Sequence, residues 1–287
     1  MPPLGADEMY PAHAAGVEAR YVFVRDGIRL RVVESGPAAG PLVLLVHGWG
    51  ASAYSYRDAL PAFAGAGFRA VAVDLPGHGL SDKPAGLDVY TRDGMTATIG
   101  ALLDALDARD ATVVGVSMGG AIALQLAVVH HPRVRRVALI NPVGLARVRF
   151  TRAARTFAPL ALRKSASVFV TRTLVRWLLQ LAYLDRSRVS ARDVDEYWAA
   201  ASQPGFAAAA TACLHQFSWT PYTEAELAAI ECPTLVVIGT RDHLITGSES
   251  RVRTIARSRV VRVSGGHAVN EACPAGVNAV LLVFARE

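Results

Sequence analysis

One short segment, residues 115–120, constrains the fold of this chain more than any other, because it places a serine between a strand and a helix. The sequence GVSMGG follows the apolar run 111–114 and precedes the helical run 121–131. Its glycines let the backbone turn sharply where larger side chains would collide. The helix that begins there directs unpaired N–H groups and its dipole toward developing negative charge. We therefore predict that Ser117, at the apex of the turn, is a nucleophile.

A second loop, at residues 47–50, is expected to form part of an oxyanion hole. The apolar run 41–46 is typical of a buried strand, and it leads directly into the sequence HGWG. A loop after a central strand can donate one backbone N–H to an oxyanion, and the residue after the nucleophile can donate another. The expected donors are the N–H groups of Trp49 and Met118.

The later part of the chain offers an acid and a base. Residues 234–238 form another apolar strand, which is followed by GTRD and hence by Asp242. The strand-like run VVRVS leads through a glycine pair to His267. A histidine in a glycine-rich loop is often structural, but its place after the last strand of the series favours catalysis. An aspartate at a strand end can orient such a histidine and stabilise its protonated form.

The motifs HGWG, DLPGHGLSD, GVSMGG, GTRD and GGHAVNE, in this order and spacing, resemble those of the α/β-hydrolase superfamily. The similarity covers nearly the whole chain from about Tyr21. It implies a mostly parallel, eight-stranded sheet flanked by helices, with a Ser-Asp-His triad in that chain order and an inserted helical cap. We expect a core of residues 1–143 and 222–287 and a cap of residues 144–221. The substrate is left open, because this fold hosts many chemistries.

Two other positions compete for the role of the acid. Asp74 ends the strand-like run AVAVD, but in the resembling family the Asp-x-x-Gly-x-Gly turn is structural. Some relatives place the acid after the sixth strand, where this chain reads Ile140-Asn141-Pro142 and has no carboxylate. A serine at residue 117 also argues against epoxide hydrolases and haloalkane dehalogenases, which use an aspartate there.

The remaining pattern is consistent with this architecture. Residues 21–35 read as two short strands joined by an Asp-Gly turn, and later apolar strands alternate with amphipathic segments. Such alternation predicts a mostly parallel sheet with helices on both faces. All three triad candidates follow strands, where sites in such sheets form.

Composition limits the class of protein. Hydrophobic residues make up 52% of the 287 positions and charged residues 19%, which suits a large core. Cys213, Cys232 and Cys273 are far apart and odd in number, so free thiols are expected and no zinc site or disulfide. The N-terminal segment lacks the features of a signal peptide, and no apolar run approaches the roughly 18–20 residues that span a bilayer. We expect a cytoplasmic enzyme without a metal or cofactor.

The charge of the expected cap is unusual. Eleven basic residues against one acidic residue, Asp185, lie between positions 147 and 192, whereas the rest of the chain has 19 basic and 23 acidic residues. The basic positions are Arg147, Arg149, Arg152, Arg155, Arg163, Lys164, Arg172, Arg176, Arg186, Arg188 and Arg192. Either the arginines cover apolar residues beneath them, or the cap meets an anionic membrane, ligand or protein. The run TLVRWLLQLAYL resembles an interfacial helix. Nucleic acid is not expected, because no recognition motif accompanies the charge.

Aromatic residues late in the cap are candidates for a hydrophobic substrate pocket, although such residues also serve packing. They are Trp198, Phe206, Phe217, Trp219 and Tyr222.

These residues together predict a serine hydrolase, specifically a carboxylesterase acting on a small to medium hydrophobic ester through an acyl-enzyme. A C–C bond hydrolase of ring-cleavage products is an alternative, although such enzymes tend to carry small residues where this chain has Trp49. A lactonase, thioesterase or perhydrolase remains open. So does a ligand-binding or membrane-associated accessory module of the same fold.

Overall fold

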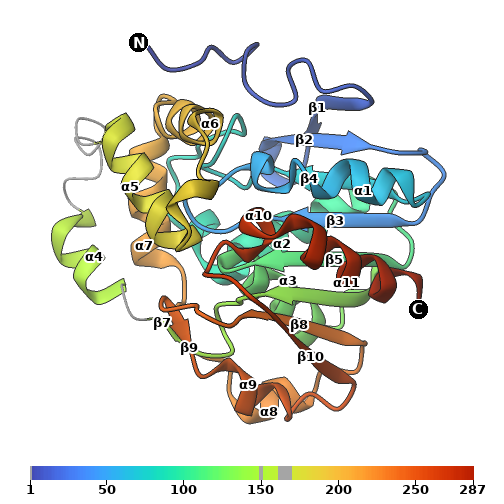
Figure 1. Cartoon of the computed structure of the whole chain (residues 1–287). Coiled ribbons are helices and arrows are strands. Elements are labelled where there is room, and N and C mark those ends of the chain that lie inside the picture. Colours follow the sequence, from blue (N-terminus) through green and yellow to red (C-terminus); the bar gives the residue numbers. More distant parts are fainter. Residues whose placement is uncertain (1, 149–150, 161–169) are drawn as a thin grey trace.

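A single eight-stranded sheet forms the centre of the computed structural model, which describes residues 2–148, 151–160 and 170–287 (Figure 1). In spatial order, its strands are β1 (Val17–Phe23), β2 (Arg29–Ser35), β4 (Arg69–Val73), β3 (Leu42–Val46), β5 (Ala111–Val116), β6 (Val134–Ile140), β8 (Thr234–Gly239) and β10 (Ser258–Val263). β2 is antiparallel to both β1 and β4, and the other neighbouring strands are parallel. The prediction of a mostly parallel sheet is confirmed.

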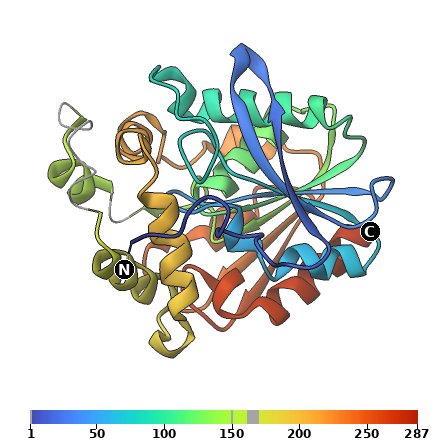
Figure 2. The same ribbon diagram turned by 90° about the horizontal axis from the view of Figure 1, so that it is seen from above.

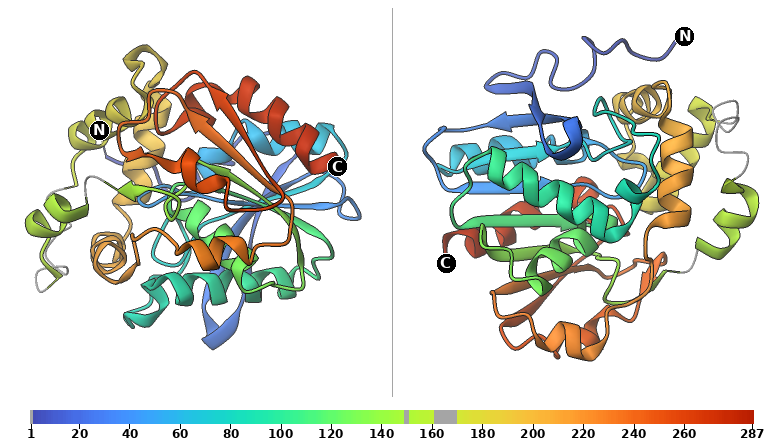
Figure 3. Two further views of the ribbon diagram at one scale, coloured as in Figure 1. Left: turned by 90° about the horizontal axis from the view of Figure 1, so that it is seen from below. Right: turned by 180° about the vertical axis from the view of Figure 1, so that it is seen from behind.

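Helices cover both faces of this sheet, as the views along its edge show (Figures 2 and 3). One face packs against α1 (Ala59–Gly65) and α11 (Pro274–Arg286), and the other against α2 (Arg92–Ala105) and α3 (Met118–Val128). Every residue of β3 and β5 is buried, because a parallel strand between two helical layers has no solvent face. This explains why both strands read as continuous apolar runs.

A mainly helical insertion lies between β6 and β8. It contains β7 (Arg147–Val148), α4 (Thr151–Phe157), α5 (Arg172–Tyr183), η5 (Arg186–Arg188), α6 (Ala191–Ala201) and α7 (Phe206–Gln216). The strand β7 pairs with β9 (Ile245–Thr246), which ties the start of the insertion to the loop after β8. These elements fall within the predicted cap, whose boundaries stay a prediction. Arg149, Arg163 and Lys164 of the basic window lie outside the described residues.

The insertion sits over the C-terminal ends of the parallel strands. The loop after β3 is hydrogen-bonded to α7, since the indole of Trp49 donates to the carbonyl of Ala210. The loop after β10 is hydrogen-bonded to α5, since the N–H of Ala268 donates to the carbonyl of Ala182. Functional residues in these loops therefore lie between the sheet and the insertion.

Short elements complete the chain. They are η1 (Arg25–Gly27), η2 (Ala53–Tyr56), η3 (Asp88–Tyr90), α8 (Glu224–Ala228), α9 (Ser248–Val252) and α10 (Val269–Ala272). The C-terminal segment is divided at Cys273 into the two helices α10 and α11. Pro274 has no N–H to continue the hydrogen-bond ladder and is well suited to the first turn of α11. Among the described residues, no helix has the length and apolar character needed to cross a membrane.

Candidate active site

Ser117 occupies a strained turn between β5 and α3. Its backbone has φ 54° and ψ −115°, a conformation that a residue with a side chain rarely adopts. A Cβ at Gly115 would lie 2.2 Å from the carbonyl oxygen of Gly119, and a Cβ at Gly119 would lie 2.1 Å from that of Val46. Both positions therefore exclude any larger residue, and the close packing they allow holds the serine at the apex.

Backbone hydrogen bonds to the end of β6 and to the segment after it also hold this turn. The N–H of Ser117 donates to the carbonyl of Ile140 at 3.0 Å, and its own carbonyl accepts from the N–H of Val143 at 2.9 Å. Met118 is the first residue of α3. Its N–H therefore belongs to the first helical turn, where backbone donors have no acceptor within the helix. The serine and this amide are held in one rigid unit.

The loop that carries Trp49 passes directly beside the serine. A Cβ at Gly48 would lie 3.1 Å from the Cβ of Ser117. The indole N–H of Trp49 donates to the carbonyl of Ala210 at 2.9 Å, and its ring meets the ring of Trp219 edge-on, with centroids 6.4 Å apart. The loop is thus held between the serine turn and α7.

His47 braces the same loop from within the core. The ring is fully buried, and this burial lowers its pKa, so it is neutral at pH 7. Its Nε2 accepts a hydrogen bond from the N–H of Leu75 at 3.0 Å, which requires the proton to be on Nδ1. The Nδ1–H then donates to the carbonyl of Gly48 at 2.7 Å.

The acid and the base predicted from the sequence contact each other. His267 Nδ1 and Asp242 Oδ2 are 2.8 Å apart, and both side chains are largely buried. The other carboxylate oxygen of Asp242 accepts from the N–H groups of Leu244 at 2.8 Å and Ile245 at 3.2 Å. The carboxylate is therefore fixed in orientation and holds one side of the imidazole.

Asn141 joins the loops that carry these residues, and its role was not predicted. Its amide nitrogen donates to the carbonyls of Gly266 and His267 at 3.0 and 2.8 Å. Its amide oxygen accepts from the N–H of Gly239, at the end of β8, at 2.8 Å. One buried side chain therefore connects the ends of β6 and β8 to the histidine loop. Its position at a strand end was the only signal that could have identified it.

Asp74, the rival acid, is committed to a turn. It is fully buried, and its oxygens accept from the N–H groups of Ala53 at 2.7 Å and Leu80 at 2.9 Å. The guanidinium of Arg31 lies 3.3 Å away. These contacts give it the structural role that the family resemblance implies.

The predicted pocket aromatics occupy different environments. Phe206 meets the buried ring of His78, with centroids 6.0 Å apart, and Trp219 meets the ring of Trp49. Phe217 packs against Trp219 in the main core. Trp198 belongs to a cluster with α5.

Tyr222 is occupied elsewhere. Its ring is buried beneath the guanidinium of Arg92, and its hydroxyl donates to the carbonyl of Ala121 at 2.8 Å. Both ends of this side chain are therefore used in packing against α2 and α3. Of the five aromatic residues, only Phe206 and Trp219 lie near the loops around Ser117.

A buried charged cluster joins the insertion to α10, the helix that follows the histidine loop. Arg57 donates to Glu271 at 2.7 Å and lies 2.9 Å from Asp193 of α6. The hydroxyls of Tyr183 and Tyr197 donate to Glu271 at 2.9 and 2.6 Å. Sequence reasoning missed this cluster, because Arg57 and Glu271 are 214 positions apart and Arg57 belongs to no motif.

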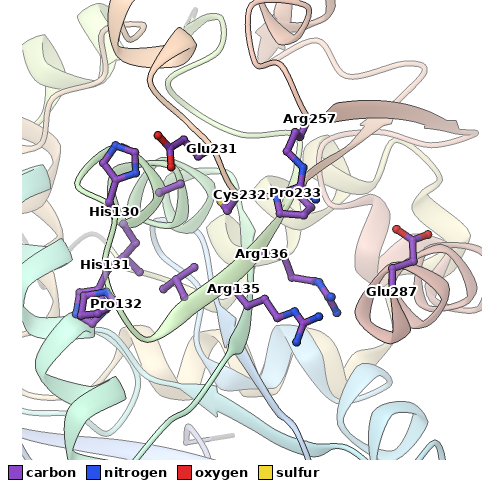
Figure 4. Close-up of a pocket in the computed structure, with 13 residues that line it drawn as sticks. His130, His131, Pro132, Arg135, Arg136, Glu231, Cys232, Pro233, Arg257 and Glu287 are labelled. Atoms are coloured by element: carbon purple, nitrogen blue, oxygen red, sulfur yellow. The ribbon is translucent and has the colours of Figure 1, made fainter.

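Two cavities lie away from these residues. One of about 700 Å³ is lined by the starts of β6 and β8 and includes His130, Arg136 and Arg257 (Figure 4). A second, of about 670 Å³, shares Arg136 and also lies at the starts of strands. Neither contains a predicted site residue. Within the described ranges, no group of three or more histidine, cysteine or acidic side chains could hold a metal ion.

Comparison with known proteins identifies the fold. Residues 41–271 match the model of the alpha/beta hydrolase fold family. The "Magnesium-chelatase 30 kDa subunit" of Rhodobacter capsulatus is 32% identical over 264 residues, which cover 88% of this chain and 89% of that protein. Epoxide hydrolase A of Mycobacterium tuberculosis is 38% identical over 122 residues, 42% of this chain and 38% of that protein.

A solved structure shows the same fold over nearly the whole chain. The enol-lactonase from Burkholderia xenovorans LB400 has a TM-score of 0.78 and 23% sequence identity. The match covers 93% of this chain and 100% of the lactonase.

Proposed function

The chain belongs to the alpha/beta hydrolase fold family, and we propose that it is a carboxylesterase in which Ser117 is the nucleophile. One observation carries the proposal, the 2.8 Å hydrogen bond between His267 Nδ1 and Asp242 Oδ2. A carboxylate that accepts the Nδ1 proton leaves the lone pair of Nε2 available to take a proton from the serine.

The proposed reaction proceeds in two steps. His267 takes the hydroxyl proton of Ser117 as its oxygen attacks the ester carbonyl, and then gives a proton to the leaving alcohol. In the second step His267 takes a proton from water, which attacks the acyl-enzyme, and then returns a proton to the leaving oxygen of Ser117 as the acid is released. Asp242 stabilises the imidazolium formed in each step. The N–H groups of Met118 and Trp49 hold the negative oxygen of the tetrahedral intermediates.

The surroundings support a small to medium hydrophobic ester. The aromatic rings of Trp49 and Trp219 meet beside the loop next to Ser117, and Phe206 lies against the neighbouring turn. Apolar walls with a few fixed polar groups suit a substrate of this kind. The serine at the elbow also separates this chain from the epoxide hydrolase relatives, whose family uses an aspartate there.

A second candidate function follows from a similarity that covers most of the chain. A protein 32% identical over 88% of the chain is named as a magnesium-chelatase subunit. A chain that worked beside a magnesium chelatase as a binding module would not need Ser117, whereas an ester hydrolase would. The two candidates therefore differ in a single testable residue.

The test is hydrolysis of p-nitrophenyl esters from acetate to palmitate by the wild type, by Ser117→Ala, and by Ser250→Ala as a control at an exposed serine. Activity in the wild type and Ser250→Ala that falls at least about a thousandfold in Ser117→Ala supports the proposal. The preferred chain length then measures the acyl site. No turnover of any ester overturns the carboxylesterase proposal and favours a C–C bond hydrolase or a binding module.

A further inference from the structure

Helix α5 has two apolar faces, of which only one is covered. Its inner face carries Val175, Leu179 and Tyr183, all buried against α6 and α10. Its outer face carries four large apolar side chains that are 39–57% exposed, which we call the outer stripe: Leu174, Trp177, Leu178 and Leu181. A surface helix of a globular protein normally has a polar outer face, so the outer stripe is unusual for a helix in this position.

The outer stripe is a continuous feature. Its members are spaced at i, i+3, i+4 and i+7, which places them on one side of the helix. They make up half of the eight large apolar side chains exposed in the described part of the chain. Helix α5 lies at the outer edge of the insertion, away from the sheet (Figures 1 and 2). The stripe is therefore accessible to a large, flat partner.

Positive charge accompanies the stripe. Arg186 and Arg188 are exposed in η5 directly after α5, and Arg188 pairs with Asp185 at 3.4 Å. Arg186 has no carboxylate partner among the described residues. Asp185 is the single acidic residue between positions 147 and 192. The surface therefore combines exposed leucine and tryptophan with unneutralised arginine, as interfacial helices do.

Two alternative roles for the stripe agree less well with these contacts. If the arginine side chains covered the apolar residues, the stripe would be buried, but Trp177 remains 57% exposed. If a second copy of the chain covered it, a two-fold interface would bring the arginines of both copies together, and like charges in contact are unfavourable. An anionic bilayer suits both the exposed apolar side chains and the positive charge, since it accepts apolar side chains and attracts arginine.

The inner face of the same helix contacts the histidine loop. The carbonyl of Ala182 accepts from the N–H of Ala268 at 3.1 Å, and the side chain of Leu184 lies against Gly266. A surface that binds the outer stripe is thus separated from His267 by the thickness of one helix. Because a helix is about 10 Å across, substrates dissolved in the bilayer would be close to the site.

We propose that the outer stripe, together with Arg186, docks this protein on the surface of an anionic lipid bilayer. Trp177 and the leucines enter the boundary between headgroups and acyl chains, and Arg186 pairs with a lipid phosphate. This binding does not depend on the proposed function, so Ser117→Ala is expected to bind vesicles as the wild type does.

The experiment is co-sedimentation of the whole chain with phosphatidylcholine vesicles, with and without phosphatidylglycerol, at low and high salt. Binding is expected only to the vesicles that contain phosphatidylglycerol, and salt should weaken it. Trp177→Glu and Arg186→Glu should each weaken binding about tenfold or more, since each removes an attractive group and adds a repelled charge.

Val283→Glu is the matched control, because Val283 is 58% exposed on α11, at the other side of the molecule. It makes the same charge change as Trp177→Glu and should bind like the wild type. Circular dichroism and the melting temperature identify a variant that fails to fold. Lack of binding to anionic vesicles, or equal loss in Val283→Glu and Trp177→Glu, overturns the proposal. The proposal is also overturned if the wild type does not bind vesicles but forms a dimer that Trp177→Glu dissociates.

Discussion

The strand ends and the helical insertion are built on different principles. At the strand ends, Ser117 and its neighbours are held by backbone hydrogen bonds and by glycines that touch other backbone atoms. The insertion is joined to the core partly through side chains, above all those of Asp193, Tyr183 and Tyr197, which contact Arg57 and Glu271 of the core. It also carries the positive charge of the chain, +10 over positions 147–192 against −4 elsewhere. The candidate catalytic residues and the surface that meets the surroundings of the protein therefore belong to separate parts of the molecule.

The largest effect on stability is expected where buried charged side chains join the two parts. Replacing Arg57 by methionine leaves the buried carboxylates of Glu271 and Asp193 without their cation and should cost about 3–5 kcal/mol. Urea unfolding at pH 7 measures this cost. Arg262→Met is the control, since Arg262 pairs with Glu249 at the exposed surface and its loss should cost less than about 1 kcal/mol. Similar costs for both variants would show that the buried cluster does not join the parts.

The strand ends can be tested at the glycines. Gly119→Ala places a Cβ 2.1 Å from the carbonyl oxygen of Val46, and the backbone on both sides must shift, which should cost about 3 kcal/mol. Gly65→Ala, at the end of α1, meets no atom within 4 Å and should leave the melting temperature unchanged or slightly raised. A tolerated alanine at residue 119 would contradict the close packing of the serine turn.

Asn141 tests how strictly the strand ends fix the histidine loop. In Asn141→Asp a carboxylate would face the carbonyls of Gly266 and His267, so we expect a loss of about 2 kcal/mol and a lower kcat. Asn278→Asp is the matched control, because Asn278 also donates to a backbone carbonyl but lies on α11. It should lose stability with little change in kcat.

A double variant makes this test sharper. Asn141 stands after the sixth strand, where some relatives carry the acid. The side chain of Asn141 holds the backbone of the histidine loop and not the imidazole ring. We therefore expect that adding Asn141→Asp to Asp242→Asn does not restore activity. Recovery of turnover in this double variant would contradict this geometry.

A smaller effect, on the pH dependence of stability, is expected at the boundary between the two parts. His78 is fully buried against Phe206 of the insertion, and this burial lowers its pKa to about 3. The unfolded chain binds a proton at His78 below about pH 6.5 and the folded chain does not, so stability is lost as the pH falls. Between pH 7 and pH 5 this loss amounts to about 2 kcal/mol. His78→Asn should lose about that much less in urea unfolding over the same range, and parallel pH profiles would refute this assignment.

The sequence was informative about the strand ends for a physical reason. A nucleophile on a tight turn needs glycines at fixed spacing, and parallel strands buried on both faces need continuous apolar runs. Ser117, Asp242 and His267 could therefore be located without coordinates. The close contact of Asp242 with His267 follows from the fact that both come after parallel strands whose ends meet.

The joining of the insertion to the core and the roles of the aromatic residues could not be predicted from the sequence, because they depend on contacts between distant positions. Arg57 and Glu271 of the core contact Asp193, Tyr183 and Tyr197 of the insertion, and no local pattern marks these contacts. The aromatic residues show the same limit: Tyr222 and Phe206 look alike in sequence, yet one packs on α3 and the other against His78. The residue types in TLVRWLLQLAYL resemble an interfacial helix, but only the structure distinguishes the covered face of α5 from its exposed one.

The central claim is that Ser117 is activated by His267, and labelling by a fluorophosphonate tests it most directly. Intact-mass and peptide mass spectrometry would count the labels on each chain and identify their position. We predict one label per chain, on Ser117, formed about a thousandfold more slowly in His267→Ala. A chain that takes no label, or takes it at another residue at the same rate in both proteins, would contradict this claim.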